Sequence, residues 1–389
     1  MKCEEPEAGP LKGHRFRFFV GKIFSILKTM TELQYLTAIY AFNYFGPVRV
    51  KLLLSYFKKA RNIWLAKNSE LIEIGLSKDK VSEFDEFRKK FDIEDYFRRL
   101  KGLKIGVVTT LDREYPENLR DLEGAPSVLY FKGCLKTSDV NSVAIVGSRK
   151  MSSYGREVAQ KFSAELASFG VTIISGLAKG IDTAAHMGAL SVGGRTIAVL
   201  GQGLDSVYPP ENADLAEKII KSDGAILSEY PLGMPALPIN FAIRNRIVSG
   251  LSAAVVVIEG AEKSGTLLTA SHAAEQGKTV FAVPGQITSP MSAAPHFLLR
   301  NGAKIATSAT DILEELDLQI KVDKEKIEKI MPSTKEEVKL IEILEVEPLH
   351  LDELVRITGG KTADISARLT IMEMKGIVRN LGGGIYRKA

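Results

Sequence analysis

Four short segments of the sequence each bring a cation together with small residues, and each is a candidate for binding phosphate. They are residues 146–150, 175–180, 243–246 and 263–266. Three of them follow an apolar run and precede a helical pattern, where unpaired N–H groups and the helix dipole attract anions. Glycine lets the backbone approach such a ligand closely. We expect the four turns to meet at one edge of a sheet and to hold phosphates of either a polymer or a small nucleotide.

Individual side chains in these turns have separate expected roles. Arg149 can donate two hydrogen bonds to one phosphate, and Ser148 and Ser175 can donate hydroxyl hydrogen bonds. Thr266 is expected to cap the helix that it begins, which leaves the backbone N–H groups of residues 264–265 for an anion.

The segment Arg244-Asn245-Arg246 follows Phe241 closely and fits a single-stranded nucleic acid. Arginines can hold its phosphates, and an aromatic ring can stack on a base. The alternative is a structural role, in which one arginine forms a salt bridge and Phe241 is buried.

Two further patterns bear on catalysis. Asp182 and His186 are four residues apart on one helix face, which allows either an acid–base pair or a structural hydrogen bond. Residues 201–203, Gly-Gln-Gly, lack the spaced third glycine of a dinucleotide fingerprint, so hydride transfer is poorly supported.

The composition is that of a globular protein, with 45% hydrophobic and 25% charged residues in a chain of 389. Lys and Arg exceed Asp and Glu by six in residues 1–100, whereas the acids exceed the cations by one in residues 101–316. A nucleic-acid site in the second segment therefore needs its cations concentrated at one place. Two cysteines and no apolar run of about 18 residues favour a cytoplasmic protein that does not cross a membrane. No metal or cofactor is expected.

The order of helical and strand patterns predicts how the chain positions the turns. Short apolar strands alternate with helices over residues 142–283, which predicts a parallel sheet covered on both faces, with ligands beyond the carboxyl ends of its strands. Residues 32–100 are helical around a Gly-Pro turn, as in a sterile-alpha-motif (SAM) or helix-hairpin-helix unit; a plain helical hairpin is the alternative. Three helices and a glycine-rich hairpin after residue 334 resemble a winged helix. The predicted fold class is α/β, with an extended Rossmann-like parallel sheet between these two smaller domains.

The expected boundaries follow from these patterns and from composition. They are a disordered extension over 1–29, a helical domain over 30–100, an extended Rossmann domain over 101–316, a charged linker over 317–333 and a winged-helix domain over 334–389. The basic and aromatic segment 15–22 also leaves open a membrane-surface role or a start codon placed too early. Thr31 is expected to cap the first helix.

Taken together, the motifs resemble the DprA (Smf) family of bacterial DNA-processing proteins. The matching segments come in family order over about residues 110–310; they include Gly147-Ser148-Arg149, residues 175–182, Tyr208-Pro209, Glu229-Tyr230-Pro231, Arg244-Asn245-Arg246, and Glu259 with Ser264-Gly265-Thr266. The resemblance implies a Rossmann domain that binds single-stranded DNA, forms a homodimer and loads the recombinase RecA during natural transformation.

The complete set of residues predicted to bind DNA or phosphate, from the turns and the resemblance together, is Gly147, Ser148, Arg149, Ser175, Gly176, Lys179, Gly180, Phe241, Arg244, Asn245, Arg246, Lys263, Ser264, Gly265 and Thr266. The chain departs from the family pattern at Ala242, where the family usually has proline. It also departs over residues 292–298, where the family usually has Gly and Asn ahead of a Leu-Ile pair.

Two other functions fit parts of the pattern. Rossmann phosphoribohydrolases carry a Gly-Gly-x-Gly-Thr turn followed closely by a catalytic glutamate, but here the first acid after Thr266 is Glu275. An enzyme is therefore not expected. A winged-helix regulator that uses the sheet only as a sensor would prefer a duplex sequence.

Overall fold

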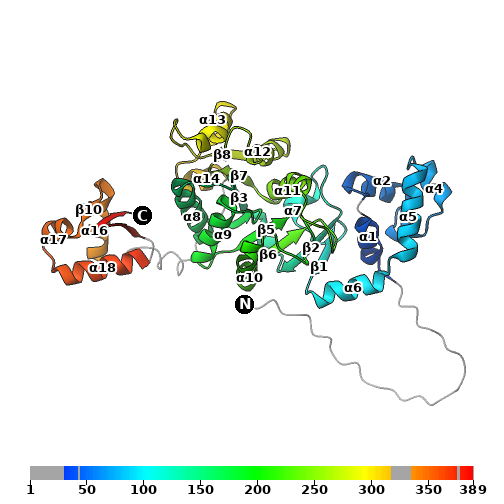
Figure 1. Cartoon of the computed structure of the whole chain (residues 1–389), viewed down its shortest axis with the longest axis horizontal. Coiled ribbons are helices and arrows are strands. Elements are labelled where there is room, and N and C mark those ends of the chain that lie inside the picture. Colours follow the sequence, from blue (N-terminus) through cyan, green and yellow to red (C-terminus); the bar gives the residue numbers. More distant parts are fainter. Residues whose placement is uncertain (1–29, 43, 317–333, 375–376, 389) are drawn as a thin grey trace, which may run out of the picture.

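The computed structural model describes residues 30–42, 44–316, 334–374 and 377–388. The extension predicted for 1–29 and the linker predicted for 317–333 lie outside the described residues. Figure 1 shows N-terminal helices, a central sheet covered by helices, and a small C-terminal unit, arranged along the long axis. Within the described ranges, no helix combines the length and apolar character needed to span a membrane.

The N-terminal part is helical, as predicted. Its helices are α1 (Glu32–Ala41), α2 (Pro47–Phe57), α3 (Ala60–Leu65), α4 (Asn68–Glu73), α5 (Lys78–Lys90) and α6 (Ile93–Gly102). Thr31 caps α1 in a capping box with Gln34, which confirms the predicted start of this helix. Gly46 and Pro47 begin α2, where a proline costs no helical hydrogen bond.

The central sheet runs in the order β1-β2-β6-β5-β4-β3-β7-β8-β9. Its strands are β1 (Gly106–Thr109), β2 (Val128–Gly133), β3 (Ser142–Val146), β4 (Thr172–Ser175), β5 (Thr196–Leu200), β6 (Ala225–Ser228), β7 (Ala254–Val257), β8 (Thr279–Ala282) and β9 (Lys304–Ile305). The strands from β6 to β9 in this order are parallel, which confirms the prediction, while β1 and β2 extend the sheet in antiparallel pairing.

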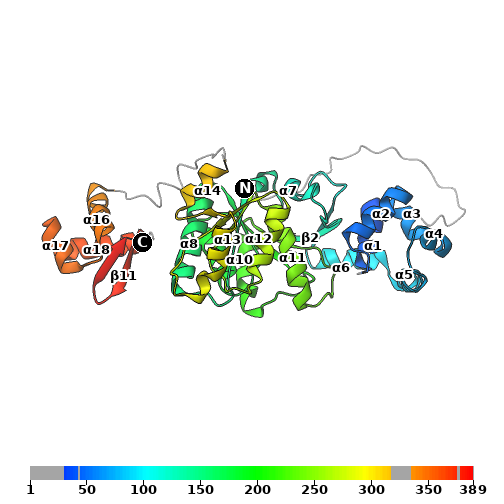
Figure 2. The ribbon, with the colours of Figure 1, turned by 90° about the horizontal axis from the view of Figure 1, so that it is seen from above.

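Helices cover both faces of this sheet (Figure 2). Helices α8 (Ser153–Ser168), α9 (Ile181–Ser191) and α14 (Ala309–Glu315) pack on one face with Val143 and Ile145. The opposite face carries α7 (Glu117–Arg120), α11 (Pro238–Leu251) and α12 (Thr266–Glu275), packed on Ala144 and Val146. Successive side chains of β3 therefore point to opposite faces of the sheet and pack in two different cores, as in any pleated strand. The remaining elements are α10 (Ala213–Lys221), α13 (Ala293–Arg300) and the short 3₁₀ helices η1 (Thr137–Val140), η2 (Pro210–Asn212) and η3 (Pro290–Ser292).

The N-terminal helices share a hydrophobic core with the sheet. One cluster joins Leu36 and Phe84 of these helices to Tyr130 of β2 and Ile226 of β6. Tyr96 of α6 lies within hydrogen-bond distance of Tyr130, with 3.2 Å between the two hydroxyl oxygens, and accepts a hydrogen bond from the Leu232 N–H at 3.1 Å. The helical part is thus packed onto the antiparallel side of the sheet.

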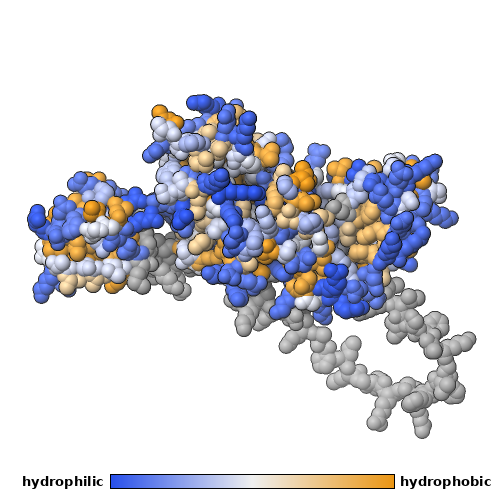
Figure 3. All heavy atoms as spheres, viewed as in Figure 1, coloured by the Kyte–Doolittle hydropathy of each residue, from blue (hydrophilic) through white to orange (hydrophobic). Residues whose placement is uncertain are grey.

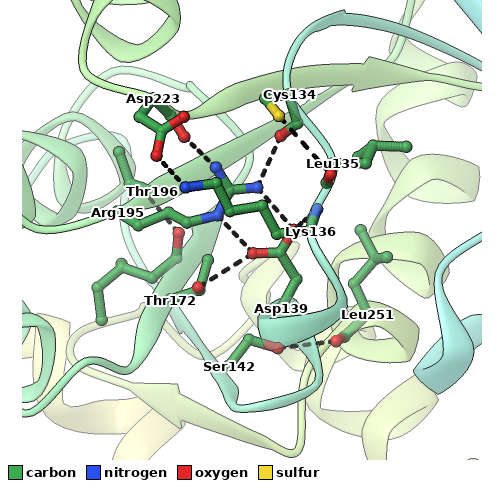
Figure 4. A network of polar contacts seen from close by, with 11 residues as sticks. Cys134, Leu135, Lys136, Asp139, Ser142, Thr172, Arg195, Thr196, Asp223 and Leu251 are labelled. Carbon is green, nitrogen blue, oxygen red and sulfur yellow. Dashed lines mark hydrogen bonds and ion pairs between the residues drawn. The ribbon is translucent and has the colours of Figure 1, made fainter. Parts of the chain in front are cut away.

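Polar contacts tie the loops together at the amino ends of the parallel strands (Figure 4). Arg195 lies just before β5 and donates to Asp139 through Nε at 2.5 Å and through Nη2 at 2.6 Å. The same guanidinium donates to the Cys134 carbonyl at 2.7 Å, and Thr172 donates to Asp139 at 3.2 Å. This network fixes the edge of the sheet opposite to the predicted phosphate site.

The C-terminal unit has the predicted winged-helix arrangement. It contains α16 (Lys335–Val346), β10 (Leu349–His350), α17 (Leu351–Thr358), α18 (Thr362–Met374), β11 (Val378–Gly382) and β12 (Ile385–Lys388) around its own core. Arg379 and Arg387 of the hairpin both donate to the Glu157 carboxylate of α8, Arg379 at 2.8 Å. These ion pairs join the hairpin to the central domain.

The arginine-rich segment corrects one prediction of local structure. Arg244-Asn245-Arg246 is not a turn but lies inside α11, which begins eight residues before Arg246 at Pro238. Because positions two apart on a helix point in nearly opposite directions, Arg244 and Arg246 cannot serve the same ligand surface. The Pro238 start signal indicates where this helix begins.

Candidate nucleic-acid interface

The loops that follow β3, β4 and β7 enclose a cavity of about 510 Å³ at one edge of the sheet. Predicted residues from all four segments line it; they are Gly147, Ser148, Arg149, Gly176, Phe241, Arg244, Asn245, Ser264, Gly265 and Thr266. Parallel pairing of β3 with β4 and β7 places the carboxyl ends of these strands side by side. Residues distant in the sequence therefore meet where ligands of open parallel sheets bind.

The loop after β3 is held in place by Glu259, a buried residue just beyond β7. The Ser148 N–H donates to the Glu259 carbonyl at 2.8 Å. Ser152 donates to the Glu259 carboxylate through its N–H at 2.9 Å and through its hydroxyl at 2.5 Å. The loop between these serines presents Arg149 and Lys150 as exposed cations. Its shape is therefore set before any ligand arrives.

The start of α12 provides a second loop of small residues at the cavity. Ser264, rather than Thr266, supplies the capping contact, since its hydroxyl oxygen accepts the Thr266 N–H at 3.2 Å. This corrects the predicted roles of the two residues. The Ser264 N–H donates to the Ala261 carbonyl, while the exposed Gly265 N–H has no protein partner in the described part of the chain. Gly265 is thus the backbone donor here that remains for an anion.

A buried arginine forms the floor of the cavity. Arg244 is 4% exposed and donates through Nη1 to the Gly176 carbonyl at 2.7 Å and to the Val199 carbonyl. Burial lowers the pKa of Arg244 to about 10, an effect that the nearby Asp182 carboxylate opposes. A Cβ at residue 176 would lie 2.4 Å from Arg244 Nη2, so only glycine leaves room for the guanidinium. The fork joins the carboxyl ends of β4 and β5.

Aromatic rings and cations form one wall of the cavity. The Arg149 guanidinium lies 5.3 Å from the centre of the Phe241 ring, at cation–π distance. The Tyr208 ring lies 5.6 Å from Phe241 at an interplanar angle of 32° and is 46% exposed. Arg149, Lys179, Tyr208 and Phe241 line an adjoining cavity of about 80 Å³. This wall offers flat surfaces for bases beside charges for phosphates.

Asp182 and His186 do not form an acid–base pair. The Asp182 carboxylate accepts the N–H groups of Gly176 at 3.1 Å and Ala178 at 3.3 Å. His186 lies 2.7 Å from the Thr196 hydroxyl through Nδ1, and burial lowers its pKa to about 3. Both side chains are buried; Asp182 shapes the β4–α9 turn, and His186 joins α9 to β5, so the structural alternative describes them.

Acidification is expected to destabilise the fold through His186. Below about pH 6.5 the unfolded chain binds a proton that the folded state rejects, so stability should fall by about 1.4 kcal/mol per pH unit from this group. The loss begins at the unfolded pKa and continues toward the folded value of about 3. Urea unfolding between about pH 7 and pH 4 checks this, because His186→Gln should remove that slope. Equal slopes in both proteins would contradict it.

Comparison with known proteins then fixes the family. The sequence model of DNA recombination-mediator protein A matches residues 106–317, more than half of the chain. The chain belongs to the DprA (Smf) family. A DprA winged-helix domain model matches residues 326–384 in addition.

Individual DprA and Smf proteins are similar over most of their length. Protein Smf of Escherichia coli strain K12 is 36% identical over 335 residues, which cover 83% of this chain and 89% of that protein. The X-ray structure of Streptococcus pneumoniae DprA has a TM-score of 0.58 and 35% identity, covering 74% of this chain and 94% of the other. Helicobacter pylori DprA, whose structure concerns its single-stranded DNA binding mode, has a TM-score of 0.50 and 28% identity, covering 56% and 97%.

Five of the predicted site residues lie outside the main cavity. Ser175 is buried, and its hydroxyl donates a hydrogen bond to the Ile145 carbonyl at 2.7 Å. Gly180 has a positive φ of 84°, and a Cβ at this position would collide with the Ser148 carbonyl oxygen. Lys179 lines the adjoining small cavity but pairs with Glu211 at 2.5 Å. Lys263 is exposed on the α12 loop without lining either cavity.

Arg246 is the fifth of these residues, and its position argues against the predicted DNA contact. Its guanidinium donates to the Gly124 carbonyl at 2.6 Å and to the Glu229 carboxylate, which also accepts the Tyr40 hydroxyl at 3.1 Å. Burial raises the pKa of Glu229, and Arg246 opposes that shift. Arg246 therefore joins α11 to the sheet and to helix α1.

Sequence reasoning missed three contributors to the interface. Lys150 lines the cavity beside Arg149, Tyr208 extends the aromatic wall, and Glu259 positions the β3 loop. Lys150 and the Tyr208-Pro209 pair were visible as a second cation and as part of a family motif. The role of Glu259 depends on the β3–β7 pairing, which local sequence does not specify.

The two departures from the family pattern both border the cavity. Ala242 lines it directly, next to Phe241. Residues 292–298 follow Met291, another lining residue, and the Ala294 N–H donates to the Gly260 carbonyl at 2.8 Å. These positions can alter the shape of the pocket while the sheet stays the same.

Proposed function

We propose that this protein binds and protects single-stranded DNA in the cavity at the carboxyl edge of the sheet and loads RecA onto it during natural transformation. One observation carries the proposal: exposed Arg149 and Lys150 stand beside the Phe241–Tyr208 aromatic wall. Cations that track a backbone and rings that stack on bases are what sequence-tolerant binding to a single strand requires. The family description as a recombination mediator supports the loading step.

We propose a binding protein rather than an enzyme of the phosphoribohydrolase type. Asp182 is the carboxylate among the described lining residues of the main cavity, and backbone N–H groups already engage it. Glu259 lies behind the loop and is engaged by Ser152. Neither carboxylate is placed to activate water at a sugar. We also propose a cytoplasmic location and the division into domains at residues 30–100, 101–316 and 334–389.

Competition between single-stranded and duplex oligonucleotides of the same sequence tests the proposal. The single strand should bind more tightly, and binding should weaken as salt rises because phosphate contacts release counterions. Incubation with nucleoside monophosphates should release no base. Preference for duplex would favour the winged-helix regulator, and steady release of base would favour the enzyme; either result would reject the proposed function.

RecA loading has its own test. Assembly of RecA filaments on a single strand coated with single-strand-binding protein should start sooner when this protein is present. An unchanged delay, with DNA binding intact, would limit the function to binding and protection.

We further propose that a homodimer forms through the β9 edge of the sheet. A groove of about 450 Å³ lies beside this two-residue strand, between α12, β8 and α13. Phe297 lines this groove and Ile305 belongs to β9 itself, and each is 54% exposed. At the other edge of the sheet, α1 packs beside β1. Exposed apolar residues on an unpaired strand edge favour self-association.

Replacing Ile305 by aspartate should halve the mass measured by light scattering, because burying a carboxylate at an apolar contact costs free energy. Val346→Asp is the matched control, since Val346 is 83% exposed on the winged helix. A dimer that persists in Ile305→Asp would place the contact elsewhere.

A further inference from the structure

Helices α2 and α3 form a surface with unusually one-sided charge. Residues 47–69 contain six cations and no carboxylate; the cations are Arg49, Lys51, Lys58, Lys59, Arg61 and Lys67. All six side chains are exposed: Arg49 and Lys51 on α2, and the other four around α3. Within the described residues, none of the six is in an ion pair. We call these six residues and the apolar stripe described next the α2–α3 face.

An apolar stripe runs between the cations of α2. Val48, Leu52 and Tyr56 recur at four-residue steps and are 71%, 53% and 54% exposed. Val50 and Leu53 on the other side of the helix are fully buried in the core. Helical spacing puts Lys51 on one flank of the stripe and Arg49 on the other. The helix thus presents rings and methyl groups between two positive charges.

On the neighbouring helices, by contrast, several cations are in ion pairs. On α5 and α6, Lys80 pairs with Glu83 at 2.7 Å, Arg88 with Asp85 at 2.9 Å, and Arg98 with Asp95 at 2.9 Å. Two acids contact the backbone of this face rather than its cations: Glu32 accepts the Ala60 N–H and Glu70 accepts the Lys67 N–H, each at 2.7 Å. The cations of this face outnumber the acids beside it and have no side-chain ion pair within the described residues, which favours a polyanion as partner.

The face is also fixed relative to the cavity. Tyr40 of α1, Glu229 and Arg246 of α11 form one buried hydrogen-bonded set, and Phe241 and Arg244 of the same helix line the cavity. In Figure 1, α2 lies on the side of the N-terminal helices that faces α7 and α11, and in Figure 2 α6 and α1 lie between the sheet and the rest of these helices. Orange and blue atoms lie side by side over this region in the space-filling view (Figure 3).

We propose that the α2–α3 face is a second binding surface for single-stranded nucleic acid, which takes the part of a strand that extends beyond the cavity. The proposal rests on the proposed function of the cavity. Phosphates would pair with Lys51 and Lys59, and a base would stack on Tyr56. A strand supplies both kinds of contact along its length, which matches a stripe of apolar groups between cations.

Strand length separates this surface from the cavity in a binding assay. The triple variant Lys51→Ala/Tyr56→Ala/Lys59→Ala should bind a strand of about 50 nucleotides roughly 10-fold more weakly, yet bind a strand of about 12 nucleotides like the parent. Its salt slope for the long strand should shrink by about 1.4, since each lost phosphate contact removes about 0.7. The matched control is Lys78→Ala/Lys90→Ala, which removes two exposed cations from α5; it should change neither affinity.

Photo-cross-linking of the parent protein gives a second readout. A long strand that carries 5-bromouracil should form an adduct on the peptide that contains Tyr56. Unchanged long-strand affinity in the triple variant, an equal loss for both lengths, or adducts confined to the cavity would overturn the proposal. Failure of the proposed function would look different, because the parent would then not bind the short strand at all.

Discussion

Replacing Arg149 by alanine is expected to weaken the binding of a short single strand by roughly 10- to 100-fold at low salt. The guanidinium is exposed at the mouth of the cavity and is held over the Phe241 ring. Its removal takes away a charge-assisted pair of hydrogen bonds to phosphate, and the slope of affinity against salt should fall by about 0.7. Fluorescence anisotropy at several salt concentrations measures both quantities.

Lys161→Ala provides the control for Arg149→Ala. Lys161 is an exposed cation on α8 whose contact with Glu165 is 4.0 Å long, and it lines neither cavity at the sheet edge. Its replacement should leave affinity and salt slope unchanged. The two variants should melt close to the parent, because surface substitutions of this kind usually change stability by less than about 0.5 kcal/mol. Equal binding by Arg149→Ala and the parent would remove Arg149 from the interface.

Replacing Arg244 by alanine is expected to cost about 2–6 kcal/mol of folding stability, because two buried carbonyls lose a charged donor and each unsatisfied group costs about 1–3 kcal/mol. The Gly176 and Val199 carbonyls would lose their donor, and the buried Asp182 carboxylate would lose the positive charge that opposes the burial effect on its pKa. Urea unfolding at neutral pH measures the loss. DNA binding should also be lost, because the floor of the cavity would collapse and not because a direct contact between Arg244 and DNA is removed.

A double variant distinguishes these two roles of Arg244. Asp182→Asn removes the buried charge, so Arg244→Ala/Asp182→Asn should be less destabilised than the sum of the single changes. Arg244→Lys keeps a charge but not the planar fork, and should fall between the parent and Arg244→Ala. If Arg244→Ala were as stable as the parent and still failed to bind DNA, the guanidinium would be a direct contact.

Local sequence was sufficient for the parallel sheet and for the turns that gather at its edge. Apolar strands and glycine turns encode both through the backbone, so Gly147, Gly176 and Gly265 were predicted at the cavity. The side-chain directions were harder to predict. Arg246 and Lys179 look like phosphate ligands in the sequence, but in the structure they pair with Glu229 and Glu211. These two acids lie 17 and 32 residues away along the chain, and no local pattern predicts the pairing. The antiparallel pairing of β1 with β2 and of β2 with β6 was also not predicted, because no local sequence pattern specifies which strands pair.

The continuous core between the N-terminal helices and the sheet limits how this protein can be dissected. Deleting residues 30–100 would expose Val128 and Tyr130 of β2 to water, since both belong to the core shared with the N-terminal helices, where α1 packs beside β2 and Tyr96 of α6 contacts Tyr130. It would also leave Glu229 without its tyrosine donor and open to solvent beside Arg246. Binding measured on such a truncated protein would therefore be confused with aggregation through the exposed apolar surface of the sheet. Point substitutions on the outside of α2 leave the shared core intact.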